Sequence, residues 1–352
     1  MRHFKIFSKE DILSLTRIRK YETKIGERIE AIKNVAEWEK ELSESKAKFV
    51  IIGIPEDIGV KGNLGIGGAD TNWHPFLNSF LNVQSNSFLT GEEMLLLGNF
   101  DFGDIKYLIE NTANNSDELI DAYRHAVSII DDEVENIIKL IVYGGKIPVI
   151  IGGGHNNAYP IIKGVAKGLK KLDLIPLAQI NCINLDAHAD YKVTEGRHSG
   201  NAFRYADRDG FLQKYVVLGM HESYVQQNVL TDLDESPFLK YFTYEDIFLR
   251  NKLSFENAID ESLNFCGNTH IGVEVDVDCI ENILSSAYTP CGISILDSRK
   301  FINQISTKAK VSYLHISEGA CQLVNGKKDE GVGKLLSYLI CDFVKGCAKY
   351  GV

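Results

Sequence analysis

Three short segments of the chain carry His and Asp residues at spacings that suit a metal centre. They are Gly152-Gly-Gly-His155, Asp186-Ala-His188-Ala-Asp190 and Asp276-Val-Asp278. In an extended chain alternate residues point to one side, so a spacing of two aims side chains at one place. Four carboxylates that converge without cations would repel one another strongly. Carboxylates with imidazoles suit Mn²⁺, so the pattern predicts two Mn²⁺ ions near His155, Asp186, His188, Asp190, Asp276 and Asp278.

Such a pair of ions has a definite chemical use. Two ions about 3.5–4 Å apart can bridge one water, polarise it to hydroxide and stabilise a tetrahedral intermediate. Each segment alone also has an ordinary structural interpretation, as a solvated strand end, a helix cap or a structural His. Their joint occurrence after apolar runs favours the metal centre. The glycine-rich stretch 59–68 lacks a G-x-G-x-x-G that opens a helix, so we interpret it as a rim loop rather than a nucleotide-binding loop.

The elements that must position these segments are buried strands separated by helices. Short β-branched apolar runs predict strands at 49–55, 147–151, 179–185, 215–219, 270–277 and 311–317. Apolar residues at helical spacing predict helices at 9–44, 116–143 (with Ser116 as the cap), 158–171, 256–265 and 330–345. The alternation predicts a doubly wound, parallel α/β sheet with its ligands at the carboxyl ends of the strands. We predict an N-terminal helical cap over 1–46 and one main domain over 47–352.

Composition excludes several function classes. The 352 residues are 44% apolar and 24% charged, as in an ordinary globular protein, and the net charge of −10 gives no attraction for nucleic acid or an anionic membrane. No signal peptide is recognisable at the N-terminus, and the apolar runs are too short to span a bilayer. The seven Cys are an odd number without a C-x-x-C pair. This pattern predicts buried thiols and a cytoplasmic location rather than a disulfide framework or zinc site.

The three motifs, in this order, resemble those of the ureohydrolase (arginase/agmatinase/formimidoylglutamase) family from about residue 48 to the C-terminus. The resemblance implies a three-layer α/β/α fold with a mainly parallel eight-stranded sheet as the catalytic domain, and a homo-oligomer as a candidate assembly. It also implies that Asp186 and Asp276 bridge the two Mn²⁺ ions. One ion would be held with His155 and Asp190, the other with His188 and Asp278. Glu318 would then contact the amidine or guanidine group of a small-molecule substrate.

Further segments are most similar to the formimidoylglutamase subgroup: Gly53–Gly59, 63–69, 73–76 and the loop Ser199-Gly-Asn-Ala-Phe203. This resemblance implies hydrolysis of N-formimidoyl-L-glutamate to L-glutamate and formamide, through attack by a metal-bridging hydroxide. Asp190 would relay a proton to the leaving amine, and Glu318 would orient the amidinium. The two substrate carboxylates need cationic or amide partners. The candidates in loops near the motifs are Lys61, Ser199, Asn201 and Arg204, together with Lys192 and Arg197.

Three departures from the family pattern leave alternatives open. The third motif lacks the usual downstream Asp-Pro, and Gly319-Ala320 replaces the usual Val-Asn-Pro after Glu318. Ser199 stands where arginases and agmatinases carry a His, with His198 one residue earlier as either a proton shuttle or an ordinary loop residue. Agmatinase, arginase and other guanidino-acid hydrolases are therefore rival assignments. From other classes, a non-catalytic metal-binding scaffold and a nucleotide-binding α/β protein are the alternatives.

Overall fold

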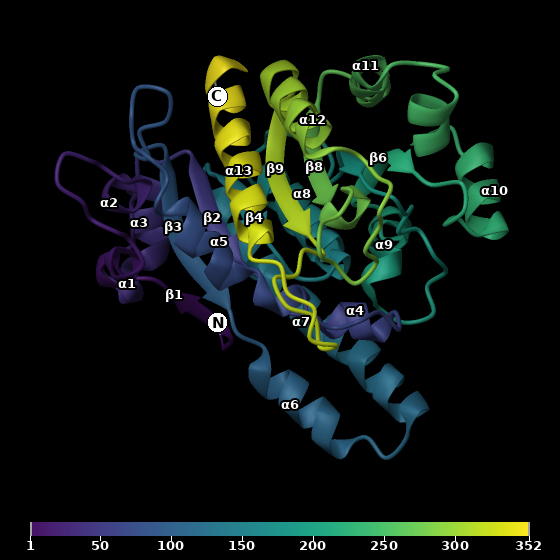
Figure 1. Cartoon of the computed structure of the whole chain (residues 1–352), viewed down its shortest axis with the longest axis horizontal. Coiled ribbons are helices and arrows are strands. Elements are labelled where there is room, and N and C mark those ends of the chain that lie inside the picture. Colours follow the sequence, from purple (N-terminus) through teal and green to yellow (C-terminus); the bar gives the residue numbers. More distant parts are fainter. Residues whose placement is uncertain (1, 351–352) are drawn as a thin grey trace.

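A nine-stranded sheet forms the centre of the molecule in the computed structural model, which describes residues 2–350 (Figure 1). The strand order is β1-β3-β2-β4-β9-β8-β5-β6-β7. Strands β2 to β9 pair in parallel throughout, and β1 pairs with β3 in the antiparallel sense. The strands are β1 (Phe4–Ile6), β2 (Phe49–Gly53), β3 (Met94–Phe100), β4 (Ile147–Ile151), β5 (Ile180–Leu185), β6 (Leu212–Met220), β7 (Leu239–Thr243), β8 (His270–Asp276) and β9 (Lys310–Ser317).

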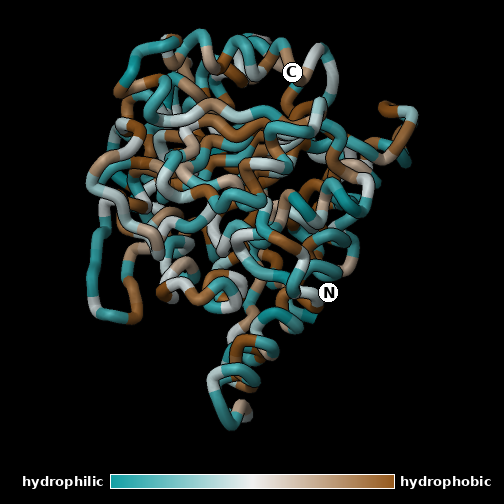
Figure 2. Tube along the Cα trace, turned by 90° about the vertical axis from the view of Figure 1, so that its right-hand side faces the viewer, coloured by the Kyte–Doolittle hydropathy of each residue, from teal (hydrophilic) through white to brown (hydrophobic). Residues whose placement is uncertain are grey.

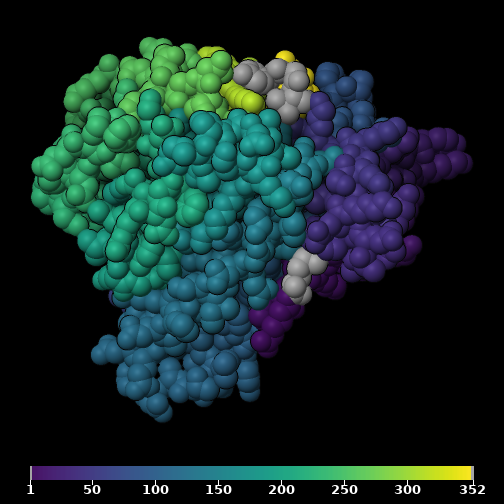
Figure 3. Space-filling view, turned by 180° about the vertical axis from the view of Figure 1, so that it is seen from behind, coloured from purple at the N-terminus to yellow at the C-terminus, as the bar shows by residue number. Residues whose placement is uncertain are grey.

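Helices cover both faces of this sheet and complete three layers. Helices α5 (Trp73–Phe80), α11 (Phe255–Cys266), α12 (Ile295–Lys308) and α13 (Gly331–Tyr350) share one buried apolar cluster with the sheet. Helices α7 (Ser116–Tyr143), α8 (Ala158–Lys171) and α9 (Ala202–Arg208) share the other cluster, and they cover the face seen in Figure 3. The predicted three-layer α/β/α fold with a mainly parallel sheet is therefore confirmed.

The remaining helices are short or lie outside the layers. They are α1 (Lys9–Ser14), α2 (Ile25–Arg28), α3 (Trp38–Glu44), α4 (Ile58–Gly62), α6 (Gly103–Thr112) and α10 (Gln227–Glu235). Helix α6 and the start of α7 form an arm that projects from the body (Figures 1 and 2). Asn115, rather than Ser116, caps α7, because its side chain accepts from the backbone N–H groups of Asp117 and Glu118. Within the described residues, no helix has the length and apolar character to cross a bilayer.

The N-terminal segment differs from the helix predicted over 9–44. The apolar side chains of Ile12, Ile25 and Ile29 are buried, as the helical spacing indicates, but only short helices form there. Backbone groups between them are held by other parts of the chain. The N–H groups of Ile25 and Gly26 donate to the carbonyl oxygens of Val83 and Leu81, and Glu30 forms a bridge with Leu95 of β3. Strand β1, which precedes this segment, extends the sheet beyond the eight parallel strands. Bonding to the sheet edge thus replaces continuous helix in this segment.

A buried histidine at the start of β8 leads to a prediction about acid stability. Burial, aided by Lys310, lowers the pKa of His270 to about 4 from an ordinary 6.5. Between pH 6.5 and about pH 4, His270 is protonated in the unfolded chain but not in the folded chain. The free energy of unfolding therefore falls as the pH drops through this range. The total loss expected from this group is about 3 kcal/mol. Urea unfolding of wild type and His270→Gln between pH 7 and 4.5 should show the flatter dependence in the variant.

The exposed His125 provides a matched control for this measurement. His125→Gln should retain the wild-type pH dependence. If the free energies of unfolding of wild type and His270→Gln change with pH in parallel, His270 binds its proton equally in the folded and unfolded chain. That result would contradict the predicted effect of its burial.

Candidate metal centre

The motif residues meet at the carboxyl ends of four neighbouring strands. The sheet order places β4, β9, β8 and β5 side by side, so segments far apart in the sequence end at one edge (Figure 1). His155 follows β4, and the segment Asp186–Asp190 follows β5. Asp276 ends β8 and Glu318 directly follows β9. The parallel strand arrangement, predicted from the apolar runs, brings these residues to the same edge of the sheet.

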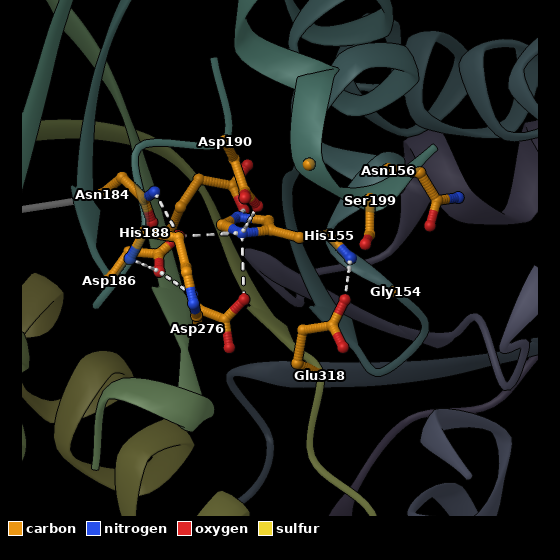
Figure 4. Close-up of polar contacts among 12 residues, drawn as sticks. Gly154, His155, Asn156, Asn184, Asp186, His188, Asp190, Ser199, Asp276 and Glu318 are labelled. Carbon is orange, nitrogen blue, oxygen red and sulfur yellow. Dashed lines mark hydrogen bonds and ion pairs between the residues drawn. The ribbon is translucent and has the colours of Figure 1, made fainter. Parts of the chain in front are cut away.

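His155 lies at the centre of a first ligand group, which it forms with Asp186, Asp190 and Asp276 (Figure 4). Its Nδ1 atom is 3.2 Å from Asp186 Oδ2, 2.9 Å from Asp190 Oδ2 and 3.1 Å from Asp276 Oδ2. One ring nitrogen carries at most one proton and cannot satisfy three carboxylates. A divalent cation at the same place would satisfy all four groups, because its ligands are deprotonated oxygens and imidazole.

A second ligand group lies next to the first. His188 Nδ1 is 3.2 Å from Asp278 Oδ2 and 3.6 Å from Asp186 Oδ1. Asp186 therefore directs one oxygen to each group, which is the geometry of a bridging ligand. Asp276 belongs by distance to the first group, and its other oxygen accepts from the backbone N–H of Asp278.

The electrostatics of the cluster also fit bound cations. Burial raises the pKa of Asp276 well above its ordinary value, with the charges of Asp278 and Asp186 adding to the effect. Burial likewise raises the pKa of Asp278 to about 6, against the opposing charge of His188. Asp278 Oδ1 is buried without a hydrogen-bond partner. These carboxylates gain their ionised form at least cost when positive charge is bound among them.

Two non-glycine residues at this edge of the sheet have a strained backbone. Asp190 and Glu318 adopt the left-handed region, with φ of 44° and 62°, which costs energy for residues other than glycine. Gly153 (φ 78°) precedes His155, and a Cβ there would come within 2.7 Å of the Ile54 carbonyl oxygen. The strained turn sends the Glu318 carboxylate back toward the centre, where it accepts from His155 N–H at 2.9 Å (Figure 4). It also accepts from Ser286 Oγ at 3.2 Å.

A small cavity of about 170 Å³ opens onto the cluster. His188, Asp190, Asp276, Asp278 and Glu318 form its inner wall. Asp276, Asp278 and Glu318 are buried. The outer part is lined by the half-buried Asn63 and Lys192 and the exposed Tyr224 and Gln226, together with the buried Ser199.

Two of these loop features shape what the cavity can accept. Lys192 is the only Lys or Arg among the described residues that line the cavity. Its ammonium donates to Asn63 Oδ1 at 2.9 Å, and Asn63 Nδ2 donates to Ser199 Oγ at 3.2 Å. The Tyr224 ring stacks on the His188 ring with centroids 5.3 Å apart. The cavity thus has an anionic inner end and a cationic, polar outer end.

Two residues expected to bind substrate lie elsewhere. The Lys61 ammonium pairs with Glu110 at 2.6 Å. The Arg204 guanidinium pairs with Asp232 and donates to the Tyr191 carbonyl. Neither side chain lines the cavity. Among the residues predicted to bind the substrate carboxylates, only Ser199 and Lys192 line the cavity.

Asn201, His198 and Arg197 shape the loop instead of facing the cavity. Asn201 accepts from Arg197 and from the His198 backbone, and the buried Arg197 pairs with Asp131 at 2.8 Å. His198 is buried, its Nδ1 accepts from the Gly200 N–H, and burial lowers its pKa to about 3. A neutral ring engaged with its own loop is poorly suited to the proton-shuttle alternative.

Sequence reasoning missed Asn63, Tyr224 and Glu274. Asn63 begins the segment 63–69 noted for its resemblance, but no role was predicted for its side chain. Tyr224 lies in a loop without a recognisable motif, whose path is set by tertiary contacts. Glu274, by contrast, stands two residues before Asp276 on the same strand, so the alternation that picked out Asp276 and Asp278 could have pointed to it as well.

Comparisons with known proteins agree with this geometry. A model of the arginase family matches residues 47–333. Formimidoylglutamase of Streptococcus pyogenes serotype M3 is 28% identical over 166 residues, which cover 46% of this chain and 48% of that relative. The chain thus aligns with about half the length of such curated relatives.

Two solved structures share the fold. Formiminoglutamase of Trypanosoma cruzi with Mn²⁺ aligns with a TM-score of 0.68 and 18% identity, over 92% of this chain and 98% of that one. Formimidoylglutamase of Bacillus subtilis aligns with a TM-score of 0.69 and 16% identity, over 94% and 93%. At these identities the likeness establishes the architecture.

Proposed function

The chain belongs to the arginase family, and we propose that it is a formimidoylglutamase that hydrolyses N-formimidoyl-L-glutamate to L-glutamate and formamide with two Mn²⁺ ions. The observation that carries this proposal is the polarity of the cavity. Its inner end holds carboxylates that suit metal ions and an amidinium, and its outer end holds the Lys192 ammonium. A substrate with an amidine at one end and carboxylates at the other matches this order of charges.

The metal ligands in this proposal are those of the two groups described above. His155, Asp186, Asp190 and Asp276 would hold one ion, and His188 and Asp278, with the shared Asp186, the other. Bound there, divalent cations would neutralise the carboxylates and supply an activated water and charge stabilisation for the addition step. The hard oxygen ligands with imidazole favour Mn²⁺ over metals that prefer thiolates.

The chain's own residues would bind and orient the substrate and move the proton. Glu318 lines the cavity beside the ligand groups, so its carboxylate can pair with the amidinium and hold the formimidoyl carbon over them. Lys192, with Asn63 and Ser199, would hold a carboxylate at the outer end. Asp190 faces the cavity and would pass a proton to the amine of the leaving glutamate.

The rival substrates differ in what they place beside Lys192. Agmatine carries a cation at the end remote from its guanidine, and the Lys192 ammonium would repel it. Arginine and guanidino acids carry a carboxylate and fit the same charge order, so they are the closer alternatives. A metal-binding scaffold without activity would need no anion site in the cavity. We further propose a cytoplasmic location, which the seven free thiols favour. We also propose a homo-oligomeric assembly, on the basis of the family resemblance.

A substrate screen of the Mn²⁺-loaded protein tests the proposal. Formimidoylglutamate, arginine, agmatine and guanidinobutyrate are supplied separately, with formamide, urea and ammonia assayed as distinct products. We expect formamide from formimidoylglutamate. Lys192→Gln should raise KM for that substrate by about 10–100-fold, since a charged hydrogen bond contributes about 1.5–3 kcal/mol.

The surface lysine Lys170 supplies the matched control. Lys170→Gln should leave KM unchanged, because Lys170 lies on α8 away from the cavity. Urea release from arginine without formamide release from formimidoylglutamate would replace this assignment with a guanidine hydrolase. No product from any of the four substrates would favour the scaffold.

A further inference from the structure

A buried acidic residue that belongs to neither ligand group lies directly behind His155. Glu274 is in β8, two residues before Asp276, and its side chain is fully buried. Its Oε2 atom is 2.6 Å from His315 Nδ1 and 3.3 Å from His155 Nε2. Its Oε1 atom accepts from the Tyr313 hydroxyl at 2.7 Å. A carboxylate removed from water in this way must be compensated by partners, and all three of these partners can donate a proton.

The two nitrogens of His155 face different surroundings. Nδ1 points to the carboxylates of the first ligand group, whereas Nε2 points to Glu274. Nε2 makes no well-aligned hydrogen bond and is buried, so Glu274 is the acceptor within its reach. A histidine that binds a metal through one nitrogen commonly donates its other N–H to a carboxylate, which fixes both tautomer and ring orientation.

The spacing of this cluster indicates hydrogen bonds rather than another cation site. His155, Glu274 and His315 are close enough to suggest a third group of metal ligands. However, the Glu274–His315 contact of 2.6 Å is a hydrogen-bond length and leaves no space for an ion between the two atoms. His315 Nε2 in turn lies 3.3 Å from the carbonyl oxygen of Gly152, in the loop that carries His155.

We propose that Glu274 is a positioning residue. It accepts a hydrogen bond from the Nε2–H group of His155, so that Nδ1 carries no proton and points toward the metal. The proposal rests on the metal centre of the proposed function. His315 and Tyr313 keep the Glu274 carboxylate in place from β9, and His315 also joins it to the Gly152 carbonyl. The neighbouring strands thus position the ligand that follows β4.

The test measures Mn²⁺ binding to the full chain by equilibrium dialysis and metal analysis, without any substrate. Glu274→Leu removes the acceptor and the charge, and should weaken Mn²⁺ binding by about 10–100-fold. Glu274→Gln keeps an oxygen acceptor and should recover part of this loss. Tyr313→Phe removes one hydrogen bond that holds Glu274, and should weaken Mn²⁺ binding less than Glu274→Leu does. Glu135→Leu removes a buried carboxylate on α7, outside both ligand groups and the cavity lining, and should leave Mn²⁺ binding unchanged as the matched control.

Two readouts separate positioning from a merely structural role. The thermal unfolding of each metal-free variant reports loss of packing, whereas the dialysis measures only Mn²⁺ affinity of folded protein. In a His155→Ala background, Glu274→Gln should cause no further loss of Mn²⁺ affinity, because its effect passes through His155. If Glu274→Leu does not fold, Glu274→Gln with and without His155→Ala still decides the question.

The outcomes assign failure to one proposal or the other. Wild-type Mn²⁺ affinity in both Glu274 variants, or an additive loss with His155→Ala, would overturn the positioning role. Three Mn²⁺ ions per wild-type chain, with one lost in Glu274→Gln, would overturn it in favour of a third metal site. Weakened Mn²⁺ binding in the variants, in a protein that hydrolyses none of the candidate substrates, would support the positioning role and reject the proposed function.

Discussion

Asp186→Asn is expected to lose bound Mn²⁺ from both ligand groups and to lower kcat by about a thousandfold or more. Asp186 is the residue whose two oxygens face His155 in one group and His188 in the other. An amide keeps the shape of the side chain but cannot neutralise a dication. Loss of several kcal/mol of charge stabilisation in the transition state corresponds to a thousandfold change in rate, at about 1.4 kcal/mol per factor of ten.

Metal content and thermal stability measure this effect independently of activity. Wild type should gain melting temperature on addition of Mn²⁺, since a ligand that binds only the folded state stabilises it. Asp186→Asn should gain little. Asp260→Asn changes a surface carboxylate on α11 and serves as the control, with wild-type metal content and rate. Full Mn²⁺ stoichiometry and near-normal kcat in Asp186→Asn would show that Asp186 is not the shared ligand of the two groups.

The meeting of the candidate metal-ligand residues at one place could be predicted from the sequence because two simple regularities place them. A spacing of two in extended chain selects one side, and parallel strands end at one edge of a sheet. The order of strands in the sheet was not needed for either step. The apolar runs that end before His155, Asp186 and Asp276 are buried on both faces, and such runs are the strands most easily recognised.

The elements that were not predicted include β3, whose buried apolar run 94–97 has the same pattern as the predicted strands. Three others lie at the margins of the fold and were missed for physical reasons. Strand β1 has three residues and is defined only by its pairing with β3. Strand β7 is half-exposed at the other edge, with Lys240 and Tyr241 in its middle. Helix α12 is buried through few apolar residues, because it lies between α11 and α13 at the surface of its layer. Tertiary contacts rather than local pattern decide these elements.

The substrate side of the cavity was predictable only in kind. Cationic and amide groups near the motifs were expected, but proximity in sequence does not determine direction. Lys61 and Arg204 have carboxylate partners of their own outside the cavity. Lys192 instead reaches Asn63, which comes from the loop after α4. Choosing among such residues requires knowing which carboxylates lie near each one, and that depends on the packing of distant loops.

Glu318→Gln is expected to lower kcat/KM by about 10²–10³-fold while leaving Mn²⁺ binding near wild type. Glu318 lines the cavity but belongs to neither ligand group, so its charge is available to a substrate cation. Truncating one partner of a buried charged pair costs about 2–5 kcal/mol. Burial and Asp276 raise the pKa of Glu318, and cations bound among the neighbouring carboxylates favour its ionised form.

The hydrogen bonds of Glu318 allow its charge to be tested apart from its position. His155 N–H and Ser286 Oγ both donate to the carboxylate. Ser286→Ala removes one of these bonds, keeps the charge, and should cost no more than about tenfold in kcat/KM. Steady-state kinetics with formimidoylglutamate, together with metal analysis, should therefore rank wild type above Ser286→Ala and Ser286→Ala well above Glu318→Gln.

If Glu318→Gln instead loses Mn²⁺, Glu318 supports the metal centre rather than the substrate. If it retains both metal and activity, the amidinium must bind elsewhere in the cavity. Because Glu318 holds a strained left-handed backbone to reach this place, we expect the first ranking.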